Sequence, residues 1–524
     1  MKRTKWMLAA AAVALSAIVV SGCSASSEPS AGGDHVFVVA IPSNPPQFNL
    51  GVTNDGSATF VGRSIFDPLV NLNTDYEVVP ALAESWSANA DSTEFTLNLR
   101  HGVKWHDGTD FTSADVKFYF DEVIPIHPLG APIAAVYDHT STPDDFTVIV
   151  SLKSPFAPFI QALAGHMMLP AHLYAGTDIA TNPANLQPVG TGPYKFTSFT
   201  SGDSVIVDRN EDYWGEKGDV DEVVYRVMPD SNARALAFQS GEVDLATMLP
   251  LNQVETLKSD NRFAFDSAAM AEHLYGFFNT ASATLQNADV RKALYHAIDR
   301  DEIASKVFLG TGTPSVSPVP NQVTWAIDPA TDYTTEFDFD LDEAGRMLDA
   351  AGYPAGADGT RFSMNVTYRT DNASWATTAD LIKTSFGKIG VNVNLVGQDT
   401  QVFADTVYTQ HDFDFALQSL GAYADPSLGV ARAFICNPTN GSYRNPTGVC
   451  DPVIDGAFAA TAAVSDPAAR LAAFKTAADA VAADLGTAPL ISYNQITAYR
   501  ADKWNGIDQF NSTDVWTWGA LRAK

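Results

Sequence analysis

Charged side chains are scarce in this 524-residue chain, and basic ones are the scarcest. Charged residues make up 18% of the sequence, and 32 lysines and arginines stand against 61 aspartates and glutamates, which leaves a formal net charge of −29. A nucleic-acid partner needs a basic surface, so this balance argues against nucleic acid. It also argues against a polybasic attachment to anionic lipid, so any membrane attachment must be covalent or hydrophobic.

The motifs of common enzyme classes are missing as well. The sequence contains no Gly-x-Ser-x-Gly, His-Glu-x-x-His, Gly-x-x-x-x-Gly-Lys-Ser/Thr or Gly-x-Gly-x-x-Gly. The segment 190–194 is glycine-rich, but Pro193 removes an amide donor and no lysine follows at phosphate-binding spacing. We therefore expect no catalytic residue, no cofactor and no metal. A carboxylate pair of the kind that glycosidases use stays open among so many acids.

Neither glycine nor proline is enriched, and the chain is globular in composition. Glycine contributes 35 residues and proline 29, while 46% of the residues are apolar, which excludes a disordered or collagen-like chain. At about 150 residues per domain, the length predicts three to four domains or two large lobes.

The N-terminus carries an apolar run that is too short to span a membrane. Residues 7–20 follow the basic start Lys2-Arg3-Thr4-Lys5, and fourteen such residues fit a secretory signal, whereas a membrane span needs about 20. The run ends in Val20-Ser21-Gly22-Cys23, which resembles a bacterial lipobox.

We therefore predict a lipoprotein signal peptide at 1–22, an acylated Cys23 and a flexible tether at 23–34. The protein would then be held on the outer face of the cell membrane by its lipid. A plain secretory signal that happens to contain a cysteine remains the alternative.

Two cysteines remain after Cys23, namely Cys436 and Cys450, fourteen positions apart. In an exported protein an isolated pair of this kind predicts a disulfide. The residues between them are rich in turn formers and poor in apolar side chains, so the bridge would hold a loop. Two unpaired thiols are the alternative.

The periodicity of the chain predicts alternating strands and helices, hence an α/β protein. Alternation or β-branched runs predict strands at 95–99, 146–150, 223–227, 391–395 and 413–417. An apolar stripe predicts a helix capped by Asp289, and Asp466-Pro467 predicts the start of another. A third helix is predicted over 341–351, closed by Gly352.

From about residue 36 onward the chain resembles the bacterial extracellular solute-binding proteins of family 5, the oligopeptide-, dipeptide- and nickel-binding subunits of ABC importers. The most specific block is FTLNLRHGVKWHDG at 95–108. Further blocks occur in the family's order at 80–86, 111–116, 188–194, 210 with 213–215, 241–244, 278–280, 290–294 with 297–300, 350–353 and 389–391.

The resemblance implies an α/β, two-lobed, periplasmic-binding-protein-like fold of type II, with an extra subdomain, around a hinge. In this numbering the hinge lobe would comprise 35–70, 188–277 and 496–524, the extra subdomain 71–187, and the second lobe 278–495. The ligand would lie in the cleft between the lobes and favour their closure.

The resemblance also implies where ligand contacts would come from. The candidate ligand-binding residues are Asn44, Phe48, Tyr275, Trp375, Gln418, Tyr423 and Asp425. Peptide-binding members have Gly-Trp where this chain has Gly421-Ala422, followed by an aspartate that pairs with the peptide's α-ammonium. Asp425 matches either that aspartate or the acid that precedes proline just after it.

We therefore expect a monomeric lipoprotein that captures a solute and delivers it to the permease subunits of an ABC importer. A peptide ranks first as ligand and an oligosaccharide second. A secreted hydrolase, or a sensor that reports the solute without importing it, would be alternatives with this same composition.

Overall fold

The computed structural model describes residues 35–524 except 74–76, 267–270, 424, 439 and 508–517. The predicted signal peptide, Cys23 and the tether lie outside the described residues. In the described part of the chain, no helix is long and apolar enough to cross a membrane.

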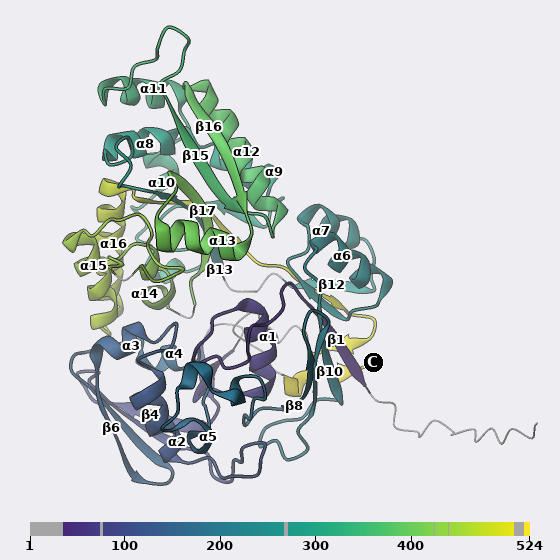
Figure 1. The fold of residues 1–524 in the computed structure, drawn as a ribbon. Coiled ribbons are helices and arrows are strands. Elements are labelled where there is room, and N and C mark those ends of the chain that lie inside the picture. Colours follow the sequence, from purple (N-terminus) through teal and green to yellow (C-terminus); the bar gives the residue numbers. More distant parts are fainter. Residues whose placement is uncertain (1–34, 74–76, 267–270, 424, 439, 508–517) are drawn as a thin grey trace, which may run out of the picture. The chain divides into compact units, whose positions relative to one another are not determined.

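A seven-stranded mixed sheet contains the start of the described chain. Its strands, in spatial order, are β12 (Phe263–Asp266), β19 (Thr497–Arg500), β11 (Leu245–Thr247), β1 (Val36–Ile41), β10 (Glu222–Val227), β9 (Ser204–Arg209) and β8 (Tyr194–Thr200). β1 runs parallel to β10 and β11, and the other pairs are antiparallel. Helices α1 (Gly56–Ile65), α6 (Ser231–Ser240) and α7 (Leu251–Leu257) accompany it (Figure 1). Phe37, Val39 and Ile41 of β1 are buried, so this strand lies inside the core.

A six-stranded mixed sheet forms a second core. Its strand order is β14 (Gly312–Pro314), β18 (Thr487–Asn494), β13 (Ala271–Phe278), β17 (Phe415–Gly421), β15 (Phe362–Arg369) and β16 (Val391–Gln398). Long helix α12 (Ala373–Lys388) lies along β15 and β16 (Figure 1), burying Ile382 and Phe386. Residues up to 277 are predicted to lie in the hinge lobe, but β13 is hydrogen-bonded to β17 and β18 in this second sheet.

Eight further α-helices lie in the same part of the described chain, between residues 288 and 484. They are α8 (Ala288–His296), α9 (Arg300–Lys306), α10 (Tyr333–Glu336), α11 (Leu341–Ala350), α13 (Thr400–Ala404), α14 (Pro426–Gly429), α15 (Pro452–Ala463) and α16 (Pro467–Asp484).

A four-stranded antiparallel sheet is formed by part of the predicted extra subdomain. Its order is β4 (Ala83–Ala88), β5 (Glu94–Leu99), β7 (Thr147–Leu152) and β6 (Tyr137–Asp144). Its helices are α2 (Ser113–Phe118), α3 (Ala131–Val136), α4 (Phe159–Leu163) and α5 (Ala171–Tyr174). Two short pairs, β2 (Val70–Leu72) with β3 (Val78–Pro80) and β20 (Trp504–Asn505) with β21 (Arg522–Ala523), complete the described strands.

The predicted elements are present, with one cap misassigned. All five predicted strands coincide with observed ones, namely β5, β7, β10, β16 and β17, and each starts within two residues of the predicted position; β16 and β17 extend further than predicted, to Gln398 and Gly421. Asp466 caps α16 by accepting a hydrogen bond from Ala469 N, as predicted. The cap of α8, however, is Asn287 and not Asp289, because the Asn287 side chain accepts from the backbone N–H of Asp289. Both residues are good caps, so sequence alone did not separate them.

The glycine-rich segment at 190–194 is a packing element. A Cβ on Gly190 or Gly192 would lie 1.9 or 2.6 Å from the Ile65 carbonyl oxygen, so neither position has room for a side chain. Next to it, the buried Asp67 carboxylate accepts hydrogen bonds from Thr191 Oγ1 and Trp214 Nε1, both at 2.9 Å. Burial raises the pKa of Asp67 to about 6. These contacts join two family blocks, 188–194 and 213–215, to Asp67, which is 124 and 147 positions away in sequence.

Candidate functional site

A cavity of about 1840 Å³ is the main candidate site. Its walls come from the N-terminal segment after β1, from the α3–α4 region and from the six-stranded sheet with α12, α14 and α15. This volume exceeds the 300–1,000 Å³ that is usual for drug-sized ligands. The cavity is therefore large enough for an extended ligand such as an oligopeptide.

Four of the seven candidate residues line this cavity, and three do not. Asn44, Trp375, Gln418 and Tyr423 are on its wall. Phe48 and Tyr275 are fully buried in the two cores. Phe48 packs edge-on against Phe199 at 5.2 Å between ring centroids, and the Tyr275 hydroxyl donates to the Pro318 carbonyl at 3.2 Å. Neither aromatic ring is available to a ligand in this structure.

Asp425 is also off the cavity wall, because its carboxylate is engaged inside the protein. Both of its oxygens accept hydrogen bonds from Nη2 of Arg470, at 2.8 and 2.9 Å, and Oδ1 also caps α14 by accepting from Ser427 N at 2.9 Å. The side chains of the pair are only 4% and 12% exposed. In this structure Asp425 holds α14 against α16 and does not face a ligand ammonium.

The cavity wall instead offers buried polar atoms that have no partner among the described residues. Gln418 Oε1, Asn494 Oδ1, Thr378 Oγ1 and Arg369 Nε all lack a hydrogen bond, and all four residues line the cavity. Buried polar groups are normally hydrogen-bonded, so such a concentration needs an explanation. Two acceptors and a charged donor on one wall are suited to a ligand that both donates and accepts.

Charges of both signs line the same cavity. Glu272, Asp55 and Asp371 bring carboxylates, while Arg369, Arg432 and Arg444 bring guanidinium groups. Burial raises the pKa of Asp55, although hydrogen bonds from backbone N–H groups and the charge of Arg369 oppose the shift. Burial lowers the pKa of Arg369, but its ion pair with Asp371 outweighs that effect, so the pKa is raised overall. Arg369 therefore stays charged on the cavity wall.

Two histidines on the α3–α4 side of the cavity are buried and neutral. The rings of His127 and His166 lie 4.3 Å apart between centroids. Burial lowers the pKa of His166 to about 3 and that of His127 well below its usual value. In the described part of the chain, no group of three or more histidine, cysteine, aspartate or glutamate side chains is arranged to hold a metal ion.

The loop between the two late cysteines, residues 436–450, forms part of the cavity wall, and we call it the stapled loop. The structure pairs Cys436 with Cys450 at a Cα–Cα distance of 4.4 Å, within the usual range for a disulfide. Tyr443 and Arg444 of this loop line the cavity.

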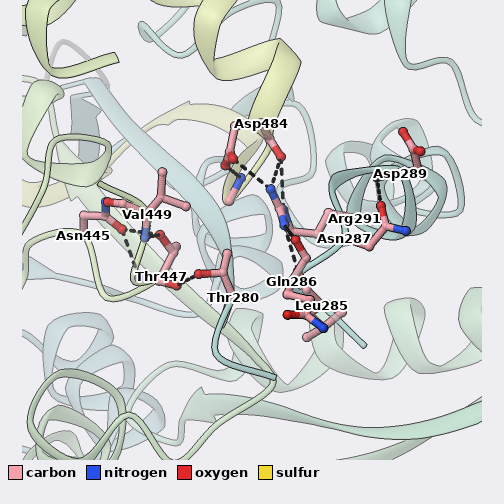
Figure 2. A network of polar contacts seen from close by, with 11 residues as sticks. Thr280, Leu285, Gln286, Asn287, Asp289, Arg291, Asn445, Thr447, Val449 and Asp484 are labelled. Carbon is pink, nitrogen blue, oxygen red and sulfur yellow. Dashed lines mark hydrogen bonds and ion pairs between the residues drawn. The ribbon is translucent and has the colours of Figure 1, made fainter. Parts of the chain in front are cut away.

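Besides the cysteine pair, hydrogen bonds within the stapled loop and from Thr280 hold it in place, as Figure 2 shows. The buried Asn445 side chain donates to the Val449 carbonyl at 3.1 Å and accepts from Thr447 N at 2.9 Å. Thr280, beside β13, donates to the Thr447 carbonyl at 2.7 Å. The loop therefore has a fixed backbone next to Arg444.

The disulfide itself remains a prediction that can be tested directly. Thiol labelling of unfolded, unreduced protein should modify neither Cys436 nor Cys450, and labelling after reduction should modify both. In the chain-entropy model, a loop of this size stabilises the fold by about 3 kcal/mol, less any strain. Two labelled thiols without reductant would show that the Asn445 contacts hold the loop alone.

Comparison with known proteins decides the family. The model of bacterial extracellular solute-binding proteins, family 5 Middle, matches residues 77–441. The chain belongs to this family. Its members are substrate-binding proteins of ABC importers and not enzymes, so this chain is a binding protein as well.

Individual relatives and structures agree over nearly the whole chain. Protein XP55 of Streptomyces lividans is 30% identical, over 97% of this chain and 94% of its own length. A putative ABC transporter peptide-binding protein of Brucella ovis is 30% identical, over 90% of each chain. The structure of NikZ from Campylobacter jejuni in complex with Ni(L-His) superposes with a TM-score of 0.84 at 21% identity, covering 94% of this chain and all of that one. The predicted two-lobed α/β fold is thereby confirmed.

The site residues that sequence reasoning missed are charged or amide side chains. Glu272, Arg369, Arg432, Arg444 and Asn494 all line the cavity. One signal was available for two of them, because Arg432 and Arg444 are cations close to the cysteine pair in a chain that is short of cations. Arg369 and Asn494 stand at the ends of strands β15 and β18, which no composition or periodicity argument singles out.

Proposed function

We propose that this protein captures a peptide in the 1840 Å³ cavity and delivers it to the permease subunits of an ABC importer. The proposal rests on the presence of both unpartnered acceptors and an unpartnered charged donor on the cavity wall. Unpartnered acceptors at Gln418 and Asn494 suit peptide N–H groups, and the unpartnered Nε of Arg369 suits a carboxylate. A peptide is zwitterionic and alternates donors with acceptors, whereas a neutral oligosaccharide presents no charge.

The relatives support this choice without deciding it. The Brucella ovis protein carries a putative peptide-binding assignment and spans 90% of this chain. The family model places the chain among importer subunits, so delivery to a permease follows the proposed capture.

We further propose that the two larger sheets are the cores of the two lobes and that the chain's crossings between them are the hinge. β18 of the six-stranded sheet is followed by β19 of the seven-stranded sheet after two residues, Gln495 and Ile496, and both of these line the cavity. Gln495 Nε2 also donates to Glu272 Oε1 at 3.1 Å. A ligand held by residues of both lobes would stabilise the closed form by its differential affinity for that form.

Thermal-shift screening tests the proposed function. A true ligand at a hundredfold excess over Kd should stabilise the protein by about 2.7 kcal/mol. For roughly 500 residues that unfold as a unit, this raises the melting temperature by about 3 °C. Short peptides should give the shift, one per chain and chemically unchanged. A shift by oligosaccharides alone would contradict the peptide assignment, and consumption of the compound would contradict a binding role.

We also propose that Cys23 anchors the protein by its lipid to the outer face of the cell membrane. Two or more acyl chains give stable attachment, whereas one alone is marginal. Cys23→Ala should therefore release the protein from the membrane fraction into the medium, as fractionation and immunoblotting would show. Equal membrane retention of variant and parent would contradict the anchor.

A further inference from the structure

Arg432 and Arg444 are neighbouring cations on the cavity wall, since the backbone N–H of Asn445 donates to the Arg432 carbonyl at 2.8 Å, and neither makes an ion pair with a described residue. Arg432 donates from Nε to the Gly429 carbonyl at 3.0 Å, and its guanidinium lies 5.0 Å from the centroid of the Tyr423 ring. Arg444 makes neither a hydrogen bond nor an ion pair with any described residue. Arg369 differs from both, because Asp371 already pairs with it.

The two guanidinium groups influence each other. Burial lowers the pKa of Arg444, and the nearby charge of Arg432 lowers it further. Two partly buried like charges are unfavourable unless an anion joins them. Because the chain has 61 acidic residues and 32 basic ones, two neighbouring arginines that make no ion pair stand out from the composition. The missing negative charge would be supplied by the ligand.

The backbone is strained at two tyrosines that adjoin this arginine pair. Tyr423, under Arg432, has φ 51°, and Tyr443, directly before Arg444, has φ 59°. Bulky residues rarely adopt this left-handed conformation, and such residues cluster at binding sites, where the surrounding structure imposes them. Asn445 and Thr447 hold the loop immediately after Arg444, because the N–H and the hydroxyl of Thr447 both donate to Asn445 Oδ1 (Figure 2).

We propose that Arg432 and Arg444 form an anion subsite for an acidic side chain of the bound peptide, separate from Arg369. Guanidinium groups bind carboxylates through paired, charge-assisted hydrogen bonds. Arg369, screened by Asp371, is left for the peptide's own carboxylate. The inference rests on the proposed function and narrows its ligand class to peptides that carry an aspartate or glutamate.

Matched peptides test this subsite. The peptides are tripeptides of alanine in which one of the three positions is replaced by glutamate or by glutamine. The two peptides of each pair then differ only in charge, and calorimetry compares their affinities. At one position the glutamate peptide should bind at least tenfold more tightly than the glutamine peptide. Arg444→Gln should bring that ratio close to one by weakening the glutamate peptide's binding. Arg444 is the variant of choice because it supports no other described residue.

Two controls separate this inference from the proposed function. Arg346→Gln removes an exposed arginine of α11 that pairs with Glu343 and is absent from the cavity wall, so it should preserve the tenfold ratio. Tight binding of every peptide with a ratio near one would overturn the acidic subsite and keep the peptide receptor. If succinate or phosphate raises the melting temperature of the parent but not of Arg444→Gln, and no peptide binds, the arginine pair is an anion site and the peptide assignment fails. Binding of none of these probes would overturn both.

Discussion

Arg369→Met should weaken peptide binding by roughly 30-fold or more. The guanidinium lies at the end of β15 on the cavity wall, with Nε unpartnered and Asp371 pairing with Nη2. Removing one partner of a buried, charge-assisted contact costs about 2 to 5 kcal/mol of binding free energy. Methionine keeps the length and the apolar contacts of the side chain, so the loss would report the charge. Isothermal titration calorimetry with a peptide selected by thermal shift measures it.

The same experiment identifies the group that Arg369 binds. The parent protein should bind a C-terminally amidated peptide more weakly than the same peptide with a free carboxylate. Arg369→Met should bind the two peptides equally well, because it lacks the guanidinium that distinguishes the amide from the carboxylate. Arg346→Met, at an exposed position of α11, should behave like the parent. Equal affinity of parent and Arg369→Met for the free acid would remove Arg369 from the site.

Asp425→Asn should destabilise the fold strongly and leave peptide affinity almost unchanged. The substitution breaks a buried pair in which both carboxylate oxygens bind Arg470, and losing one partner of such a pair costs about 3 to 5 kcal/mol. If the described residues unfold as one unit, the melting temperature falls by about 3 to 5 °C. Calorimetric unfolding measures the loss, and titration with a peptide measures the affinity.

A matched control lies on the same helix. Lys475 and Asp479 of α16 form an exposed i,i+4 pair, and solvent screens such pairs, so Asp479→Asn should leave the melting temperature almost unchanged. A hundredfold loss of peptide affinity in Asp425→Asn, without a loss of stability, would mean that Asp425 leaves Arg470 to bind the ligand ammonium, which is one of the two matches that the family resemblance allows.

Much of the fold could be predicted because short stretches of sequence determine its strands and helix starts. Period-two strands such as 391–395 and the Asp466-Pro467 helix start need no tertiary information, and the blocks at 80–116 and 188–194 fix the family. The packing reason for the second of these blocks appeared only in three dimensions. Gly190 and Gly192 leave room for the Ile65 carbonyl, and Thr191 donates to Asp67 across 124 positions of sequence.

The site could be predicted only in part, because burial and pairing decide which polar residues are available. Gln418 and Asp425 stand close together in sequence, yet Gln418 keeps an unpartnered oxygen and Asp425 is bound by Arg470, 45 positions away. Tyr275 seemed as suitable as Tyr423, but the first is in the core and the second is on the cavity wall. Only long-range contacts distinguish such pairs.

A peptide held unchanged in the 1840 Å³ cavity should come free when the protein is denatured. Mass spectrometry of the small molecules released from freshly purified, denatured protein measures this. We expect peptides at up to one molecule per chain, with aspartate or glutamate among their residues, and no such release from Arg369→Met purified in the same way. Release of an oligosaccharide or a metal chelate in place of peptides, at a similar yield from both proteins, would contradict this expectation.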